Sequence, residues 1–291
     1  MIPEELVRKI RILQITTRKV VNDVLAGEYG SVFRGRGMEF DEVREYMPGD
    51  EIRSIDWNVT ARTGTPYVKR YVEERELTVI FLVDLSASGT FGSVSKLKNE
   101  VAAELCSLLA FSAVKNNDKV GLIVFTDQVE MFIPPKKGTR HVLRVIRELL
   151  NFRPRQAKTD IVGALDYLGK VNKKRAVVFL VSDFQAEGFE KSMRVIGRRH
   201  DLVAVTITDP REVSLPDVGL LELEDAETGE LVLIDTSSAA VRKNYERLGR
   251  EQSDRFRELF ASMGVDQIDV RTDRDYVPGL VQFFRKRERR Y

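Results

Sequence analysis

The sequence predicts an α/β protein: a mostly parallel sheet with helices on both faces, an N-terminal helix with a small β-rich module before it, and an inserted β-hairpin. Continuous apolar runs such as LTVIFLVD and RAVVFLVS alternate with helical patterns, as in parallel sheets that are buried on both faces. A charged, glycine-rich segment precedes the first run, and one later stretch alternates around a turn. We expect two domains, residues 1–75 and 76–291.

Each element follows from a local pattern. Residues 3–24 place apolar side chains at helical spacing, which indicates an amphipathic helix. Residues 30–76 lack a sustained period and contain the turn signals MPGD and RTGTP, which favour short strands and loops. In the sheet domain we expect strands at 77–84, 119–126, 175–182, 201–208 and 265–272, and helices near 94–115, 138–151, 160–171, 189–199, 238–263 and 276–287. The segment LLELEDAETGELVLID has period two around a Glu-Thr-Gly turn, which predicts a hairpin near 219–236.

Composition excludes several classes of protein. The 47 basic and 45 acidic residues leave a net charge of +2, too small to attract nucleic acid or an anionic membrane over the whole surface. The single cysteine, Cys106, cannot form an internal disulfide and lies among apolar helical neighbours. The apolar run VIFLV is far short of the ~20 residues of a membrane-spanning helix. We expect a cytoplasmic protein with no transmembrane segment and no nucleic-acid partner, and we interpret the tail FRKRERRY as a solvated helix end.

Polar residues follow two of the predicted strands. Asp84, Ser86 and Ser88 have the spacing D-x-S-x-S, and Asp183 follows a later strand as Asp84 follows its own. Thr159 stands at the start of a predicted helix between them. Open α/β sheets bind ligands beyond the carboxyl ends of their strands, so these side chains are expected to converge. Their oxygen-only set with few formal charges suits Mg²⁺ or Mn²⁺ and an external carboxylate.

Other functions for this loop are open. A serine could simply cap the next helix, or the hydroxyls could hold a phosphate, although Asp84 would repel it. Aspartyl phosphatases have a second acid where this chain has Ser86. A serine hydrolase would need G-x-S-x-G and a histidine, and we interpret His141 and His200 as surface residues. A metal-dependent hydrolase or phosphoryl-transfer enzyme at the same strand ends is the alternative function.

The set Asp84, Ser86, Ser88, Thr159 and Asp183 resembles the metal-ion-dependent adhesion site, or MIDAS, of the Rossmann-like von Willebrand factor A fold. The resemblance implies that the serines and the threonine coordinate the ion and that the aspartates hold it largely through waters. It also implies that an Asp or Glu of a protein partner completes the coordination shell. Thr139 in KKGTRH competes with Thr159 as the third hydroxyl ligand.

The run GRGMEFDEVREYMPGDEIRSIDWNVTARTGTPYVKRYVEERE is similar to the hallmark segment of the bacterial domain-of-unknown-function-58 family, whose members carry a von Willebrand A-like domain. Members are often encoded beside MoxR-type AAA+ ATPases. The resemblance implies a non-enzymatic, metal-dependent adaptor that works with such an ATPase in chaperone-like or assembly activity. Many relatives carry membrane helices ahead of this segment, and this chain is expected to lack them.

Overall fold

The computed structural model of the protein describes residues 16–17, 20–21, 29, 32–33, 38–73, 76–154, 158–224 and 229–290. The helix predicted over residues 3–24 lies almost wholly outside these residues. The chain divides into two compact units, with residues 33–77 in the smaller one. The predicted first domain of residues 1–75 differs from this division, because the described residues before 33 group with the sheet. The reason is packing: the buried Tyr29 ring meets Phe284 of the last helix edge to face, with ring centroids 6.0 Å apart.

The smaller unit is built on two antiparallel strands, β1 (Met38–Glu45) and β2 (Tyr67–Glu73). Between them come a short 3-10 helix, η2 (Ile52–Ser54), and the helix α3 (Trp57–Thr63). α3 begins where the Asp56 side chain accepts from two backbone N–H groups, and it ends at Gly64, whose φ of 77° suits glycine. The predicted strand-and-loop module is therefore confirmed, with a helix added.

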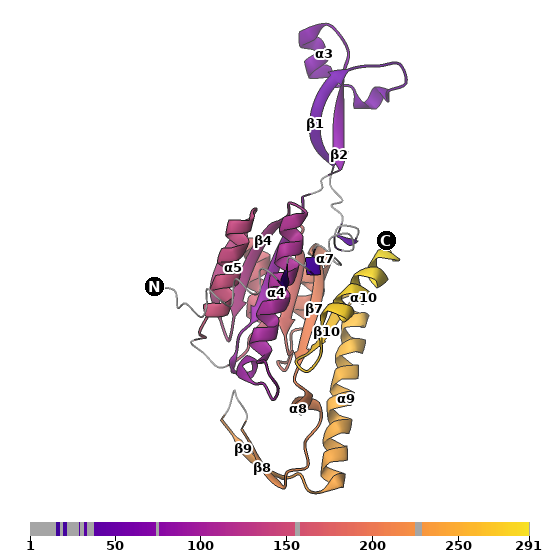
Figure 1. The fold of residues 1–291 in the computed structure, drawn as a ribbon. Helices are drawn as coiled ribbons and strands as arrows, with labels where there is room; N and C mark the ends of the chain where they lie inside the picture. Colours follow the sequence, from indigo (N-terminus) through magenta and orange to yellow (C-terminus); the bar gives the residue numbers. More distant parts are fainter. Residues whose placement is uncertain are drawn as a thin grey trace. The chain divides into compact units, whose positions relative to one another are not determined.

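The larger unit contains a six-stranded sheet of order β10-β7-β6-β3-β4-β5, in which only β5 runs antiparallel to its neighbour. Its strands are β3 (Thr78–Asp84), β4 (Lys119–Phe125), β5 (Val129–Lys136), β6 (Val177–Ser182), β7 (Asp201–Thr208) and β10 (Asp266–Arg271). Its helices are α4 (Lys98–Lys115), α5 (Thr139–Asn151), α6 (Ile161–Val171), α7 (Glu190–Arg199), α8 (Pro210–Val213), α9 (Ala239–Ser262) and α10 (Val277–Glu288). The predicted fold class is confirmed (Figure 1).

Alternation along β3 fills both faces of the sheet. Ile80 and Leu82 join a buried cluster with residues of α6, α7 and α9 on one face. Phe81 points to the other face, where it stacks on Phe179 of β6 with ring centroids 5.6 Å apart, and α4 and α5 cover this side (Figure 1). Each fully buried side chain of this size contributes roughly 1.5–3 kcal/mol, so the sheet is a rigid platform for the loops at its ends.

The edge strand β5 was not predicted from the sequence. It contains Pro134 and Pro135, which cannot donate to a strand ladder and are tolerated at a sheet edge. A Cβ at Gly121 of β4 would lie 2.9 Å from the Pro135 ring, so the glycine makes room for it.

The predicted hairpin is confirmed as β8 (Leu220–Glu224) and β9 (Leu231–Asp235), an antiparallel pair between α8 and α9. Across the described part of the chain, no helix is both long and apolar enough to cross a membrane.

The predicted surface position of His200 is wrong. His200 is 2% exposed, and neither ring nitrogen has a hydrogen-bond partner among the described residues. It is enclosed because α7 passes directly into β7 at this residue, without a loop. The charged residues of the basic tail are exposed at the end of α10, as predicted, except Arg287, which is 4% exposed and forms ion pairs with Asp201 and with Asp266, the latter at 3.2 Å.

His200 should make the protein sensitive to acid. Burial, with the charges of Arg199 and Arg175, lowers its pKa from 6.5 to about 4. Between these two pH values His200 is protonated in the unfolded chain but not in the folded protein. The free energy of unfolding therefore falls as pH drops from 6.5 toward 4. We expect wild type to lose about 2 kcal/mol more than His200→Leu between pH 7 and pH 5, measured by urea unfolding. Equal pH dependence in wild type and His200→Leu would contradict the burial effect.

Candidate functional site

Two adjacent parallel strands bring the predicted acids to one edge of the sheet. β3 pairs with β6 in the register Val83 to Val181, so Asp84 ends one strand beside Ser182, which ends the other. From β3 the chain continues to β4 on one side, and from β6 it continues to β7 on the other. Strand order reverses at this point, and ligands of open α/β sheets bind at such points.

Asp84, Ser86 and Ser88 line one pocket together with Asp183. The Asp84 carboxylate accepts hydrogen bonds from the Ser86 backbone N–H at 3.0 Å and from the Ser182 hydroxyl at 2.7 Å. The hydroxyl oxygens of Ser86 and Ser88 are 3.1 Å apart, and Ser86 is buried. The structure therefore brings together four of the five predicted site residues.

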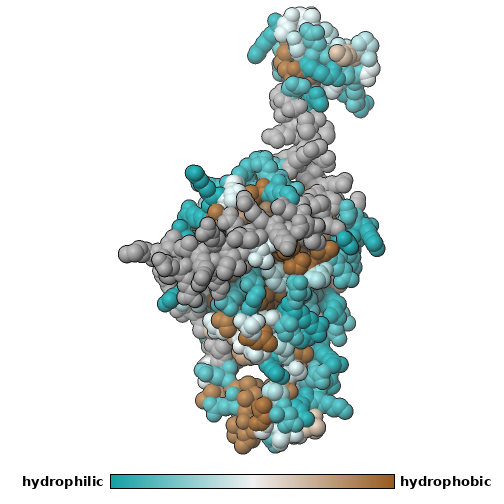
Figure 2. Space-filling model, in the orientation of Figure 1, coloured by the Kyte–Doolittle hydropathy of each residue, from teal (hydrophilic) through white to brown (hydrophobic). Residues whose placement is uncertain are grey.

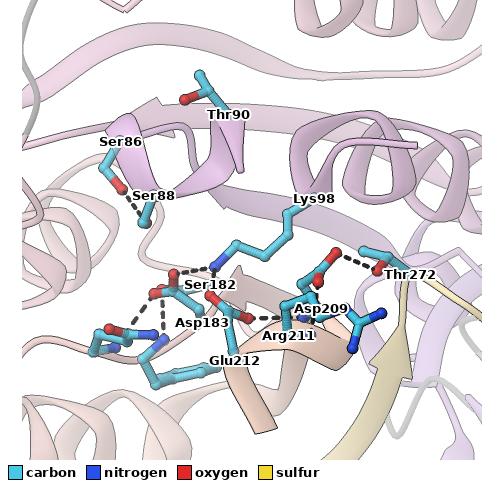
Figure 3. Close-up of polar contacts among 12 residues, drawn as sticks. Ser86, Ser88, Thr90, Lys98, Ser182, Asp183, Asp209, Arg211, Glu212 and Thr272 are labelled. Carbon is cyan, nitrogen blue, oxygen red and sulfur yellow. Dashed lines mark hydrogen bonds and ion pairs between the residues drawn. The ribbon is translucent and has the colours of Figure 1, made fainter. Parts of the chain in front are cut away.

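A lysine that was not predicted as a site residue lines the same pocket. Lys98 is the first residue of α4 and is 3% exposed. Its Nζ donates to Asp183 Oδ2 at 2.7 Å and to Glu212 Oε1 at 2.6 Å, and Figure 3 shows it reaching between the two carboxylates. The other Glu212 oxygen accepts from the Asp209 backbone N–H at 2.7 Å. Lys98 thus ties the ends of β6 and β7 to the start of α4.

Backbone constraints hold the connections around the pocket. Phe184 has a φ of 58°, in the left-handed region that bulky residues rarely enter, and its ring is buried in the core. This buried ring anchors the turn that presents Asp183. A Cβ at Gly92 would lie 2.8 Å from the Lys96 carbonyl oxygen, so glycine permits the tight turn that leads into Lys98.

Asp209 fastens the loops beside the pocket. It is fully buried and accepts hydrogen bonds at 2.9 Å from the backbone N–H groups of Ser93 and Arg211 and from the Thr272 hydroxyl. The Ser93 hydroxyl donates to it as well. Burial alone would raise the pKa of Asp209, but these hydrogen bonds hold the pKa below its usual value. Because the protein itself supplies these donors, Asp209 is a structural acid.

Thr159 lies at the same edge of the sheet but outside this pocket. The next residue, Asp160, donates its backbone N–H to the Thr126 carbonyl oxygen at 2.7 Å, and Thr126 follows β4, whose last residue is paired with Asp84. Thr159 is half-buried and is not among the residues that line the pocket around Asp84.

Thr139 lies at the opposite edge, so its proposal as an alternative ligand is wrong. It follows β5, which runs antiparallel, and Lys136 at the end of β5 is paired with Val120 near the start of β4. The direction of β5, which was missed in the sequence, decides between the two threonines.

Burial and charge oppose each other in the pocket. Burial and then the charge of Asp183 raise the pKa of Asp84 to about 6, against hydrogen bonds from Ser182 and Ser86. Burial alone would lower the pKa of Lys98, but Asp183 and Glu212 raise it above its usual value. Asp84 pairs with no cation among the described residues, so it is the acid of this pocket whose charge is least compensated.

The donors around Asp84 fit a divalent cation. The half-buried Asp84 carboxylate, which has no cationic partner in the described part of the chain, stands beside two adjacent hydroxyls, and Mg²⁺ and Mn²⁺ take oxygen ligands of this kind. In the described ranges, no three His, Cys, Asp or Glu side chains form a metal centre by themselves. The serine hydroxyls are therefore an essential part of any ion site here.

The sequence contained a sign that Lys98 belongs to the site, but it contained none for its partner Glu212. A lysine in the first turn of a helix opposes the helix dipole, which favours anions there, so its presence indicates a nearby acid. Glu212 is 114 residues away in sequence and looks like an ordinary acid before a hairpin.

The strand order, the pocket at the switch point and the D-x-S-x-S loop define a von Willebrand factor A-like domain. The sequence model of the family described as "Protein of unknown function DUF58" matches residues 42–255, and the chain belongs to this family.

Several relatives and solved structures are similar to this chain. The uncharacterized protein Rv1480 of Mycobacterium tuberculosis is 30% identical over 288 residues, which cover 98% of this chain and 90% of the relative. The uncharacterized protein YeaD of Bacillus subtilis is 29% identical over 46% of this chain and 31% of its own length. The conserved hypothetical protein BatB of Bacteroides thetaiotaomicron is similar with a TM-score of 0.45 at 18% identity, over 73% of this chain and 99% of that one. The VWA domain of SpRpn10 has a TM-score of 0.38 at 10% identity, over 70% of this chain and 93% of that one.

Removing the Asp183 carboxylate should destabilise the metal-free protein, because buried Lys98 would keep only Glu212. We expect Asp183→Ala to lower the free energy of unfolding in EDTA by about 3 kcal/mol. The double variant Asp183→Ala, Lys98→Met should recover part of that loss. Glu104→Ala removes the partner of Lys96, whose side chain is 45% exposed, and should cost less than about 1 kcal/mol. Urea unfolding measures all three. If Asp183→Ala leaves the free energy of unfolding unchanged, repulsion between the pocket acids outweighs the ion pair with Lys98.

Proposed function

We propose that this protein is a cytoplasmic binding adaptor, not an enzyme, whose strand-end pocket takes Mg²⁺ or Mn²⁺ and, with it, an Asp or Glu carboxylate of a partner protein. The observation that carries this proposal is the half-buried Asp84 carboxylate, which has no cationic partner among the described residues and stands beside the hydroxyls of Ser86 and Ser88. Bound there, the ion would supply the positive charge that attracts an external carboxylate.

Asp84, Ser86, Ser88 and Asp183 would hold the ion, and Thr159 remains a proposed ligand on the family resemblance alone. Asp183 also lines a neighbouring polar cleft with Glu212 and with residues of β7, α9 and β10. A partner that reaches the pocket from this side would therefore meet further hydrogen-bonding groups.

The hairpin offers an apolar surface for the same partner. Leu220, Leu231 and Leu233 are 69%, 58% and 65% exposed. Figure 2 shows apolar surface gathered at the lower end of the molecule, where Figure 1 places β8 and β9. Exposed apolar patches of this kind mark contact sites.

The charge of the hairpin specifies the kind of partner. Residues 216–237 contain no Lys or Arg and seven acids: Asp217, Glu222, Glu224, Asp225, Glu227, Glu230 and Asp235. On one face each exposed leucine stands opposite an acid, in the pairs Leu220 to Asp235, Leu233 to Glu222 and Leu231 to Glu224. Such a face fits a protein surface on which Lys or Arg side chains surround apolar ones. An anionic membrane or a nucleic acid would be repelled.

The pocket supports binding better than catalysis. Lys98 is held between two carboxylates that raise its pKa, so it is a poor general base. The hydroxyls of Ser86 and Ser88 contact each other rather than a basic nitrogen. A hydrolytic or phosphoryl-transfer activity would appear in turnover assays on phosphoester and peptide substrates with Mg²⁺, and we expect none.

The family resemblance suggests a MoxR-type AAA+ ATPase, or a client of that ATPase, as the partner. The partner would have to present both a carboxylate for the pocket and basic groups for the hairpin.

Metal binding should depend on the serine hydroxyls. We expect calorimetric titration with MgCl₂ or MnCl₂ to show one weak site. The double variant Ser86→Ala, Ser88→Ala should lower its metal affinity at least tenfold. Thr90→Ala is the matched control, because the Thr90 hydroxyl lies in the same loop and donates to the Ala87 carbonyl oxygen instead. Thr159→Ala tests the ligand that lies outside the pocket. Identical binding by wild type and the double-serine variant would refute the metal site.

Partner binding should depend on both surfaces. We expect binding to the MoxR-type ATPase of the same organism, measured by surface plasmon resonance, to weaken at least tenfold in EDTA and with Glu222→Lys, Glu224→Lys. High salt should weaken it as well. Glu246→Lys, Glu251→Lys on α9 makes the same charge change outside the hairpin and should have little effect. Unchanged affinity in EDTA and in the hairpin variant would contradict the adaptor proposal.

A further inference from the structure

We propose that Lys98 is an internal cation that competes with the divalent ion and so sets how tightly the strand-end pocket binds metal. The inference rests on the proposed function, because it concerns the ion of that pocket. Lys98 lines the pocket together with Asp84, Ser86 and Ser88, and its Nζ already lies 2.7 Å from Asp183.

Burying the charged Lys98 side chain costs free energy that its acid partners must offset. Its side chain is 4% exposed, and a buried ammonium group is strongly destabilising unless acids pair with it. It also lies at the N-terminus of an 18-residue helix, where the dipole opposes positive charge. Replacing Lys98 alone by an apolar residue would leave Asp183 and Glu212 without their cation, so the charge of Lys98 is the feature on which these two acids depend.

Asp183 has both carboxylate oxygens in use. Oδ2 accepts from Lys98, and Oδ1 accepts from the Gln185 backbone N–H at 3.3 Å. An ion that uses Asp183 must share this carboxylate with Lys98 or displace the ammonium group. An ion held by Asp84 and the serines alone would still have a positive charge as its neighbour in a poorly solvated pocket, where such repulsion is strong. In both cases Lys98 weakens binding of the metal.

Glu212 makes the exchange feasible. It contacts the Lys98 Nζ at 2.6 Å, and the Asp209 backbone N–H holds its other oxygen. When Asp183 turns toward an ion, Lys98 therefore keeps one acid partner and is not left as an unpaired buried charge. The pocket therefore binds the ion weakly in the absence of a partner. A partner carboxylate that arrives with the ion offsets the positive charges of Lys98 and the ion.

Calorimetric titration of wild type and Lys98→Gln with MgCl₂ and MnCl₂ tests the inference. We expect at least tenfold tighter binding by Lys98→Gln and wild-type affinity for Lys98→Arg, which keeps the charge. Lys96→Gln is the matched control, because this lysine is two residues away, pairs with Glu104 outside the pocket, and should leave the affinity unchanged. A thermal melt in EDTA and in metal gives a second readout, with a larger metal-induced rise for Lys98→Gln.

A second variant keeps the test valid if Lys98→Gln does not fold. Lys98→Gln, Glu212→Gln removes one charge of each sign and should also bind metal more tightly than wild type. Equal or weaker affinity in the glutamine variants overturns the inference. If they do not bind more tightly while partner binding is still lost in EDTA, Lys98 is not the competitor and the proposed function stands. If they bind ions and wild type does not, the inference holds and the metal part of the proposed function fails.

Discussion

The parallel pairing of β3 with β6 is the constraint on which the site depends. Both strands are apolar on both faces, so they can stand only in the middle of a sheet covered by helices. Polar chemistry is then confined to the strand ends, and the register places Asp84 next to Ser182 and Asp183 there. The chain leaves this point in two directions, which opens the space between the loops that the pocket occupies.

Charge, rather than packing, distinguishes this pocket from the rest of the interior. The core around it is apolar, yet the pocket is lined by Asp84 and Asp183 at the ends of β3 and β6 and by Lys98, whose second acid partner, Glu212 on α8, lies outside the pocket lining. Burial raises the pKa of Asp84 to about 6, which shows that its charge is poorly compensated. A site poised in this way responds to an added cation more than a fully paired site would.

Much of the fold could be predicted, because buried parallel strands and amphipathic helices have strong periodic patterns. The acids and serines of the pocket could also be predicted, since they follow such strands directly. Contacts that close at long range could not. Glu212 reaches Lys98 only through the tertiary fold, and β5 was hidden because its prolines argue against a strand unless its edge position is known. The same missed strand left Thr139 open as a ligand, and the absence of a loop after α7 made His200 look exposed.

The pocket and the hairpin together narrow the kind of partner that fits the proposed function. An ion in the pocket would select a carboxylate, whereas the hairpin, which has only acids among its charged residues, selects basic groups around apolar ones. A surface of uniform charge satisfies only one of these demands, so a polyanion such as nucleic acid would meet the ion but be repelled by the hairpin. A folded protein that displays both signs of charge a short distance apart satisfies both. α8 carries Glu212, which pairs with Lys98 of the pocket, and the next elements along the chain are the strands of the hairpin, so we expect one partner to engage both surfaces.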